Sequence, residues 1–531
     1  MRYIFFFALI FHGNSYAQEP SIEWQRCYGG TGGDVAYDIK KTSDQGYILA
    51  AGTTSNNGDV TGNHGDSDYW IIKIDSLGNL QWQKCLGGSL LESATFIMQT
   101  SEGGYLVLGF TFSNDGDVIG NHGGEDIWVI KLDSLGNSLW KKCFGGSGYE
   151  EANSALETDD GNYLIAGYTE SNDGDVSGNH DTINNRADAW VIKIDTAGNL
   201  LWQKCLGGSF DEKAYAVVCT NDHGYALSGI ASSFDGDVSG VHGFGTYDYW
   251  LVKVDTSANI QWQKCYGGFM NNQFNYEMDK LTDGGFILGG YTLCDTTGDL
   301  TNFHGQPGSP SDMWVIRTDS FGNLLHQKCL GGFNSENAFA LKQTSDGNFL
   351  VAGYTISIDG DVTGNHSQGY DGWVLKLDTS LNIMWQKCLG GSATDELKAI
   401  VQSNDGGLLV TGYATSTDGD VSGNHGGGDI WVVKLSPASA GIAIPANPIT
   451  DFAVYLNPNC NILFLNFYAN GKERTQIQLL DITGRLLLQR PLAVSIGFNK
   501  QEVNAGELNI GTYMVRLITE GGNVTKKLIK N

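Results

Sequence analysis

Proline and basic residues are scarce in this sequence, and long apolar runs are missing beyond its N-terminal region. Only 8 of 531 residues are proline whereas 73 are glycine, which excludes collagen-like and proline-rich disordered chains and favours glycine turns between ordered strands. The 32 basic residues face 59 acidic ones, a net charge of −27. Neither a nucleic acid nor an anionic membrane surface is expected as a partner, because both attract positive charge. No later stretch approaches the roughly 20 apolar residues of a membrane-spanning helix.

The N-terminus carries the parts of a secretory signal peptide. Arg2 precedes an apolar run over residues 3–11, and Ser15-Tyr16-Ala17 places small residues at the first and third positions before a cleavage site. We therefore expect a signal peptide over residues 1–17 and a mature chain that starts at Gln18. A membrane anchor is the alternative, but this apolar run is too short for one.

One unit recurs seven times between residues 18 and 436. A Trp-x-x-Cys step, with His326 replacing the tryptophan once, places cysteines at Cys27, Cys85, Cys143, Cys205, Cys265, Cys329 and Cys388. A second marker comprises Trp70, Trp128, Trp190, Trp250, Trp314, Trp373 and Trp431. Each unit has four strand-like runs, of which the first two and the last two are joined by tight turns. Such repetition predicts an all-β propeller, and no run has a sustained helical period.

The ends of the repeat complement each other. Residues 22–27 correspond to the fourth strand of a unit, whereas the last unit stops after its third strand, residues 431–435. Their pairing would complete a seventh sheet and remove an exposed sheet edge. We expect a seven-bladed β-propeller over residues 18–436 that is closed by the N-terminal strand, a linker over residues 437–446 and a small C-terminal β-sandwich over residues 447–531. An open solenoid is the alternative.

The stretch from Lys131 to Trp140, with Asp133 and Gly136 between them, resembles the tryptophan-bearing repeats of quinoprotein-type propellers. The resemblance covers residues 24–435, but its motifs are structural and imply no activity. Quinoprotein dehydrogenases also carry two adjacent cysteines near their cofactor, and this sequence has no adjacent pair. Pyrroloquinoline quinone is therefore not expected.

The C-terminal region carries four separate motifs in order: Val454 to Pro458, Asp481 to Arg485, Leu508 to Tyr513, and Lys526 to Lys530. In this order and spacing they resemble the C-terminal sorting domain of type IX secretion cargo in Gram-negative bacteria, although Leu456 stands where the family usually has proline. The resemblance implies handling by the type IX machinery, export across the outer membrane, and release or attachment at the cell surface. It assigns to the sorting motif Gly511, Tyr513, Lys526, Lys527 and Lys530. An accessory β-sandwich without a sorting role is the alternative.

Each unit also repeats two aspartates with a histidine between them. The first aspartates are Asp59, Asp117, Asp175, Asp237, Asp299, Asp361 and Asp420. Because a ligand on a ring contacts only a few units, side chains repeated in all seven are expected to bond the backbone of their own loops. The alternative is a calcium ion in each loop, held by the first aspartates. No other cofactor is expected.

A second acidic series follows each Gly-Gly step by four residues. It comprises Asp34, Glu92, Glu150, Glu212, Glu336 and Asp395, with Asn272 at the remaining place. We expect these side chains near the axis, either as solvated turn residues or, if they crowd together, balanced by a cation.

The loops between the repeated histidine and the second aspartate break the symmetry. They are longest in units three, four and five, which predicts one raised sector of the ring. Its candidate ligand-binding residues are Arg186, Phe244, Tyr247 and Pro307, since binding tends to reside on loops held by a rigid scaffold. Cys219, Cys294 and Cys460 lie outside the repeat, and no disulfide is expected.

These features favour an exported, non-catalytic propeller that binds a protein or glycan outside the cell or at its surface. No catalytic residue is assigned. A secreted polysaccharide hydrolase or lyase is the alternative and would need a few unsymmetrical carboxylates at a cleft. The sequence shows no nucleophile elbow, zinc motif or distinctive acid pair.

Overall fold

The computed structural model describes residues 19–181, 186–269, 273–293, 297–304, 310–367, 369–437, 449–457, 462–469, 475–495, 497–506, 508–519 and 522–530. Their regular elements are all β-strands, which confirms the predicted all-β class. Within these ranges no helix is long and apolar enough to cross a membrane. The signal peptide, almost all of the linker, Pro307, Cys294 and Cys460 lie outside the described residues.

The chain divides into two compact units, of which one is Glu19–Ala438. This unit contains seven four-stranded antiparallel sheets. Sheet 1 comprises β2 (Asp34–Lys41), β3 (Tyr47–Thr53), β4 (Asp68–Ile74) and β5 (Leu80–Leu86). Sheet 2 comprises β6 (Glu92–Gln99), β7 (Tyr105–Thr111), β8 (Asp126–Leu132) and β9 (Ser138–Phe144). Sheet 3 comprises β10 (Glu150–Glu157), β11 (Tyr163–Thr169), β12 (Asp188–Ile194) and β13 (Leu200–Leu206).

The next three sheets repeat this order. Sheet 4 comprises β14 (Glu212–Cys219), β15 (Tyr225–Ala231), β16 (Asp248–Val254) and β17 (Ile260–Tyr266). Sheet 5 comprises β18 (Gln273–Lys280), β19 (Phe286–Thr292), β20 (Asp312–Thr318) and β21 (Leu324–Leu330). Sheet 6 comprises β22 (Glu336–Gln343), β23 (Phe349–Thr355), β24 (Asp371–Leu377) and β25 (Ile383–Leu389).

Sheet 7 is assembled from both ends of the repeat region. It comprises β26 (Asp395–Gln402), β27 (Leu408–Ala414), β28 (Asp429–Leu435) and β1 (Ile22–Tyr28). Strand β1 runs antiparallel to β28, with Trp24 opposite Lys434 and Cys27 opposite Trp431. The N-terminal strand therefore pairs with the strand that the repeat phase predicted.

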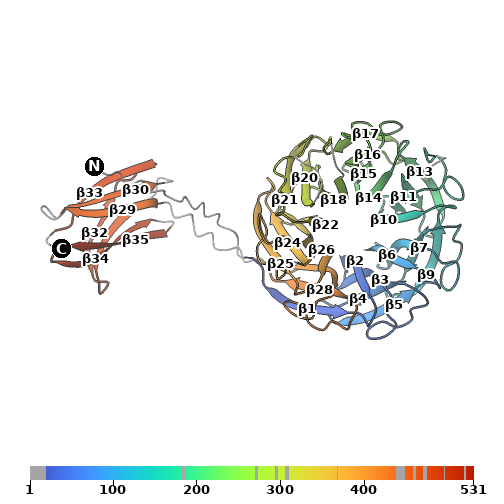
Figure 1. Cartoon of the computed structure of the whole chain (residues 1–531), viewed down its shortest axis with the longest axis horizontal. Helices are drawn as coiled ribbons and strands as arrows, with labels where there is room; N and C mark the ends of the chain where they lie inside the picture. The colour runs from blue at the N-terminus through green and yellow to red at the C-terminus, as the bar shows by residue number, and fades with distance from the viewer. Residues whose placement is uncertain are drawn as a thin grey trace. The chain divides into compact units, whose positions relative to one another are not determined.

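The sheets lie around a common centre with their first strands innermost (Figure 1). Strand β2 lies against β26 and β27, and one core cluster joins Tyr47 and Trp70 of sheet 1 to Leu409 and Val432 of sheet 7. The third strands, such as β8 and β12, are buried along their whole length. Burial on both faces explains their continuous apolar runs.

Glycine at the third tight turn allows neighbouring sheets to approach closely. Gly78 has a φ of +77°, and a Cβ added there would lie 2.8 Å from the ring of Trp24 in sheet 7. Sheet 5 carries His326 in place of this tryptophan, and sheet 6 carries Leu381 at φ +66° in place of the corresponding glycine. The glycine-rich composition thus reflects both turn geometry and packing between sheets.

The C-terminal unit contains two further sheets. The first comprises β29 (Ile449–Asn457), β30 (Ile462–Ala469) and β33 (Gly497–Asn504). The second comprises β32 (Leu486–Leu492), β31 (Thr475–Asp481), β34 (Gly511–Thr519) and β35 (Gly522–Lys530). One core contains Leu465 and Phe467 of the first sheet together with Val515 and Leu517 of the second, so the two sheets pack face to face.

Candidate functional site

The repeated histidine and second aspartate of each unit bond to each other. In sheet 2 the backbone N–H of His122 donates to Asp126 Oδ2 at 3.1 Å, and its Nδ1 lies 2.6 Å from the same oxygen. The ring contact recurs in all seven sheets at 2.5–2.8 Å. Each of these aspartate side chains is buried. This pair fixes the loop that precedes the third strand.

The first aspartates, which were the calcium candidates, form contacts to other parts of the protein. His122 Nε2 lies 3.9 Å from Asp175 Oδ2 of the next sheet, and four further pairs of this kind lie at 3.6–3.8 Å. Asp117 instead pairs with Lys141, and Asp59 Oδ2 accepts the Gly29 N–H at 3.3 Å. Among the described residues no three His, Cys, Asp or Glu side chains are grouped so that they could hold a metal ion. The geometry fits links between sheets better than calcium sites.

The second acidic series is buried and bonds the Gly-Gly loop. Glu92 Oε2 accepts the Gly88 N–H at 2.7 Å, while its Oε1 accepts the Thr111 hydroxyl at 2.8 Å. In sheet 5 this place belongs to Gln273, whose Oε1 accepts the Gly268 N–H at 3.3 Å, and not to Asn272, which lies outside the described residues. The expectation of solvated turn residues or a crowd of charges at the axis was wrong, because these side chains satisfy backbone N–H groups.

The raised sector brings together three of its four predicted residues on neighbouring loops. Arg186 and Tyr247 both bond Asp211 Oδ2, at 2.8 and 3.1 Å. Phe244 is 82% exposed, and its ring contacts Phe210 and Phe234 at centroid distances of 5.8 and 5.9 Å. Pro307 lies outside the described residues. The sector therefore offers an exposed aromatic group beside an ion pair.

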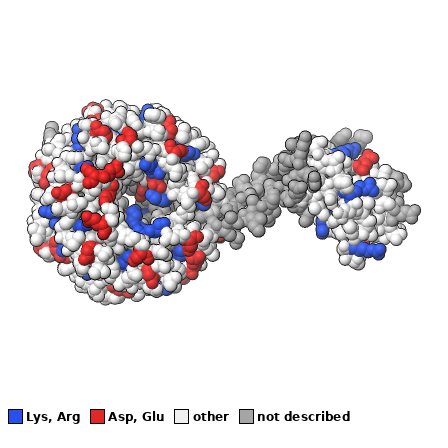
Figure 2. Space-filling model, turned by 180° about the vertical axis from the view of Figure 1, so that it is seen from behind, with Lys and Arg blue, Asp and Glu red and all other residues white. Residues whose placement is uncertain are grey.

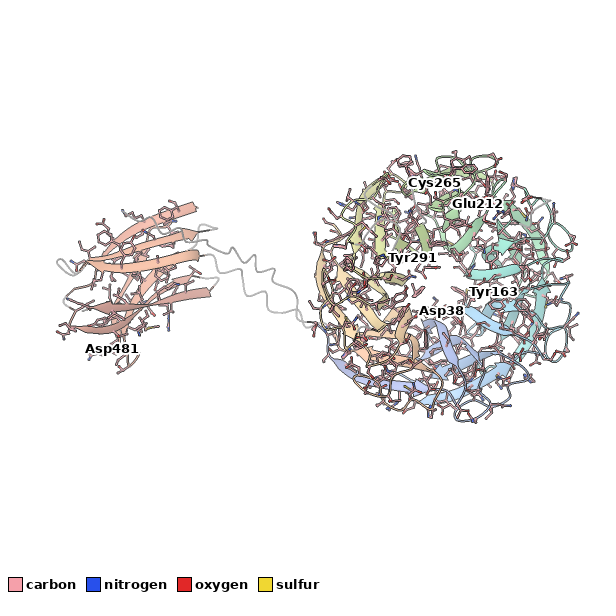
Figure 3. The ribbon with its side chains drawn as sticks, in the orientation of Figure 1. Asp38, Tyr163, Glu212, Cys265, Tyr291 and Asp481 are labelled. Atoms are coloured by element: carbon pink, nitrogen blue, oxygen red, sulfur yellow. The ribbon has the colours of Figure 1, made fainter. Side chains whose placement is uncertain are left out.

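A cavity of about 470 Å³ lies among the innermost strands of the seven sheets, and we call it the central cavity. All seven innermost strands contribute to its lining. Figure 2 shows a hollow at the middle of this unit with basic and acidic side chains at its wall, and Figure 3 places Asp38 at the inner edge of the ring.

Each innermost strand has a bulge at its fourth residue, where the register to the second strand shifts. The bulged residues are Tyr37, Thr95, Asn153, Tyr215, Tyr276, Phe339 and Lys398, and all of them line the central cavity. A bulge leaves one residue unpaired and turns its side chain away from the regular alternation. The fold thus directs one side chain per sheet at the centre, and the seven positions hold five residue types.

The bulged residues divide the lining into two walls. Three consecutive sheets carry an aromatic bulged residue: Tyr215, Tyr276 and Phe339. The ring centroids of Tyr215 and Tyr276 lie 5.5 Å apart, and those of Tyr276 and Phe339 lie 5.3 Å apart. We call these three the aromatic wall. The other four bulged residues, Lys398, Tyr37, Thr95 and Asn153, also come from consecutive sheets and form the polar wall. The cavity is therefore amphipathic.

The lysines of the cavity have acidic partners. Lys40 bonds Asp38 at 2.8 Å, Lys342 bonds Asp279 at 2.8 Å, and Lys398 bonds Glu396 at 2.7 Å. Lys398 also lies 3.5 Å above the Phe339 ring, a favourable cation–π contact.

Two glutamates of the lining have perturbed acidity. Glu151 accepts the Tyr168 hydroxyl at 2.7 Å, and burial raises the pKa of its carboxyl. Burial also raises the pKa of Glu277 to about 7, against the opposing charges of Lys40 and Lys342. Acidic groups shifted in this way gather at functional sites.

Sequence analysis missed the central cavity. The sequence did contain one signal: the fourth position of the innermost strand holds different residue types in different units, such as Thr95, Asn153 and Lys398. The strict alternation of apolar and polar residues that predicts a strand does not reveal a bulge, so the inward direction of these side chains could not be inferred.

The residues assigned to the sorting motif lie in the C-terminal unit. Gly511 begins β34, and Tyr513 is buried with its hydroxyl donating to the Asn509 carbonyl at 2.8 Å. Lys526 and Lys527 are exposed on β35. Lys530 donates to the Leu508 carbonyl at 2.7 Å, which ties the last strand to the segment before β34.

Comparison with solved structures and curated proteins gives distant similarities. The Neurospora crassa Pan2 WD40 domain is 10% identical, with 79% of this chain and 96% of that chain covered and a TM-score of 0.44. Puromycin hydrolase is 11% identical, with 86% and 61% covered and a TM-score of 0.42. The regulatory protein FlaEY of Caulobacter vibrioides is 31% identical over 157 residues, which span 28% of this chain and only 16% of FlaEY.

The C-terminal unit has a family match. Residues 453–531 match the family model of the secretion system C-terminal sorting domain, which confirms the domain that the tail motifs predicted. This domain indicates that the chain is secreted cargo of the type IX system.

Proposed function

We propose that the seven sheets are the blades of one closed β-propeller. Three observations support this proposal: β1 pairs with β28, β2 lies against β26 and β27, and one core cluster contains residues of sheets 1 and 7. Closure protects the edges of the first and last sheets from pairing with other chains.

We propose that the protein is an exported binding protein whose ligand enters the central cavity. The observation that carries this proposal is the difference between repeated and variable residues. The repeated polar side chains bond their own loops and neighbouring sheets, whereas the seven bulged side chains that line the cavity are of five different residue types. A single ligand needs such an unsymmetrical surface, and concave sites with aromatic walls and a few polar groups are typical of ligand binding.

Binding is tested with the purified full chain on a glycan array and in a pull-down from surface proteins of the producing bacterium. Tyr276→Ala is expected to weaken capture of the ligand at least tenfold. Phe321→Ala, which changes an aromatic side chain that is 69% exposed and outside the cavity, is the matched control. Equal capture by both variants and the original protein would contradict a ligand site in the cavity.

The raised sector is a separate candidate contact because Phe244 is exposed beside Arg186 and Tyr247. Phe244→Ala in the same assays distinguishes it from the cavity. If Phe244→Ala abolishes ligand capture and Tyr276→Ala does not, the binding site lies on these loops and not in the cavity.

Delivery to the outside or to the cell surface is proposed to depend on the C-terminal sorting domain. Deletion of residues 447–531 is expected to retain the protein inside a bacterium that has the type IX system, as measured by immunoblots of cell and medium fractions. Normal export of the shortened chain would contradict this role.

A secreted saccharide hydrolase is a second candidate function. The observation that favours it is Glu277, whose burial-raised pKa of about 7 would let it donate a proton near neutral pH, with the Asp38 carboxylate in the same cavity. Incubation with a polysaccharide panel tests it. If the protein is a hydrolase, it should release saccharide products from this panel. Glu277→Gln should abolish this release while the variant still binds the saccharide.

A further inference from the structure

We propose that the ligand of the central cavity is a neutral saccharide of one or two sugar rings. This inference rests on the proposed binding function and adds the chemical class of the ligand. It follows from the size of the cavity, its balanced charge, its two walls and one available carboxylate oxygen.

The size of the cavity suits a small ligand. Its volume of about 470 Å³ lies within the range of roughly 300–1,000 Å³ that is typical of small-molecule sites. A folded partner domain would not fit, whereas one or two sugar rings would.

The charges of the lining are balanced, in contrast to the net charge of −27 of the whole chain. The acidic side chains that line the cavity are Asp38, Glu151 and Glu277, and the basic ones are Lys40, Lys342 and Lys398. Each lysine already bonds a carboxylate. An anionic ligand would have to displace a carboxylate from one of these lysines and leave a partly buried charge without its partner, which is costly. A neutral ligand avoids that cost.

The two walls match the two surfaces of a sugar ring. The aromatic wall of Tyr215, Tyr276 and Phe339 offers ring faces for the C–H surface of the sugar. The polar wall and the paired charges offer donors and acceptors for its hydroxyl groups. Because each ammonium and each carboxylate is held by a partner, their directions are set before the ligand arrives.

Glu277 provides an acceptor close to the aromatic wall. Its Oε1 accepts the Met278 backbone N–H at 3.3 Å, and its Oε2 has no hydrogen-bond partner among the described residues. Glu277 follows the bulged Tyr276 directly, so the same strand supplies a ring and a carboxylate to the cavity. A sugar hydroxyl that donates to this oxygen would position the ring against Tyr276.

The inference is tested by isothermal titration calorimetry with the purified full chain. The neutral probes are maltose, cellobiose, xylobiose and N,N′-diacetylchitobiose, and the charged probes are digalacturonic acid and the disaccharide of glucosamine. At least one neutral probe is expected to bind, and Tyr276→Ala is expected to weaken that binding at least tenfold. Glu277→Gln, which keeps the shape of the side chain, is expected to weaken it three- to tenfold. Phe321→Ala is expected to leave it unchanged.

The outcomes separate the ligand class from the binding function. Binding of charged probes alone, or neutral binding that neither cavity variant weakens, would overturn the saccharide inference. Capture of a surface protein that Tyr276→Ala abolishes, without binding of any neutral probe, would overturn the ligand class and leave the proposed function intact. Melting temperatures of the variants show whether each is folded. If Tyr276→Ala does not fold, Glu277→Gln still tests the inference.

Discussion

The indole Nε1 of Trp431 donates a hydrogen bond at 2.8 Å to Oε1 of Gln25, a residue 406 positions away. The same bond joins residues only 13 positions apart in five other sheets, as between Trp70 and Gln83. The N-terminal strand thus supplies the partner that each of these sheets provides from its own hairpin. Its contribution to stability should therefore equal that of an ordinary fourth strand.

Removal of the Trp24 side chain is expected to lower the free energy of unfolding by about 3 kcal/mol, because its ring packs against Gly78 of sheet 1. Urea denaturation measures this change. Trp82→Ala, at the equivalent place in sheet 1 facing Gly136, is the control and should cost a similar amount. A negligible effect of Trp24→Ala beside a large effect of Trp82→Ala would argue against a structural role for β1.

Lys141→Gln is expected to stabilise the protein by about 1 kcal/mol. In sheet 2 Lys141 occupies the place of the usual glutamine, and the buried Nε1 of Trp128 has no hydrogen-bond partner. Glutamine would restore that bond at the expense of the partly exposed pair between Lys141 and Asp117. Thermal denaturation monitored by circular dichroism checks the gain. Lys141→Ala removes the pair without adding a partner, so it should show no such gain.

Stability is expected to fall as the pH rises from about 5 to 8. Burial raises the pKa of Glu212 and Glu336 to about 7, and the bond to Asp248 raises the pKa of His242. These groups hold protons more tightly in the folded than in the unfolded chain. Their stabilisation is therefore complete below the unfolded pKa and is lost as the pH passes through the folded one.

Melting temperatures at pH 5, 6, 7 and 8 test this dependence. Glu212→Gln should flatten it, because sheet 5 already functions with Gln273 at this place. Below about pH 4 the trend should reverse, since hydrogen bonds from Thr42 and Lys73 hold the pKa of Asp44 near 2 against the effect of burial. A melting temperature that rises between pH 5 and 8 would contradict the assignment.

Calcium is expected to leave the melting temperature unchanged. Five of the first aspartates lie against histidines and Asp117 pairs with Lys141, so a cation would have to displace these partners. Calorimetry of EDTA-treated protein with and without added calcium measures the difference. Asp175→Asn should lower stability in both conditions, because it weakens the contact to His122. A melting temperature that rises with calcium would indicate that the first aspartates of the loops bind the metal ion.

The repeat, the strands and the partner of the N-terminal strand were predictable because tryptophan markers and glycine turns fix the phase of each hairpin. The role of the carboxylates that follow the Gly-Gly steps was not predictable. An acid in a short polar link resembles a solvated turn residue, and only the fold reveals that Glu92 receives the N–H of Gly88. The position of Gln273 was missed because this residue follows Gly268 by five positions, one more than in the other units.

The candidate site was predictable only in part. Unequal loop lengths located Arg186 and Tyr247 on neighbouring loops, and the structure joins both to Asp211. The bulges that turn Tyr276 and Lys398 inward depend on the register between two strands, which no property of the individual residues specifies.

The composition of sheet 7 also sets an order of events during biosynthesis. Sheets 1 to 6 each consist of consecutive strands and can form as the polypeptide emerges. Strand β1 emerges before these six sheets, yet its partner β28 ends at Leu435. Strand β1 therefore cannot pair with β28 until all seven repeats have followed, and chaperones have that interval in which to shield it.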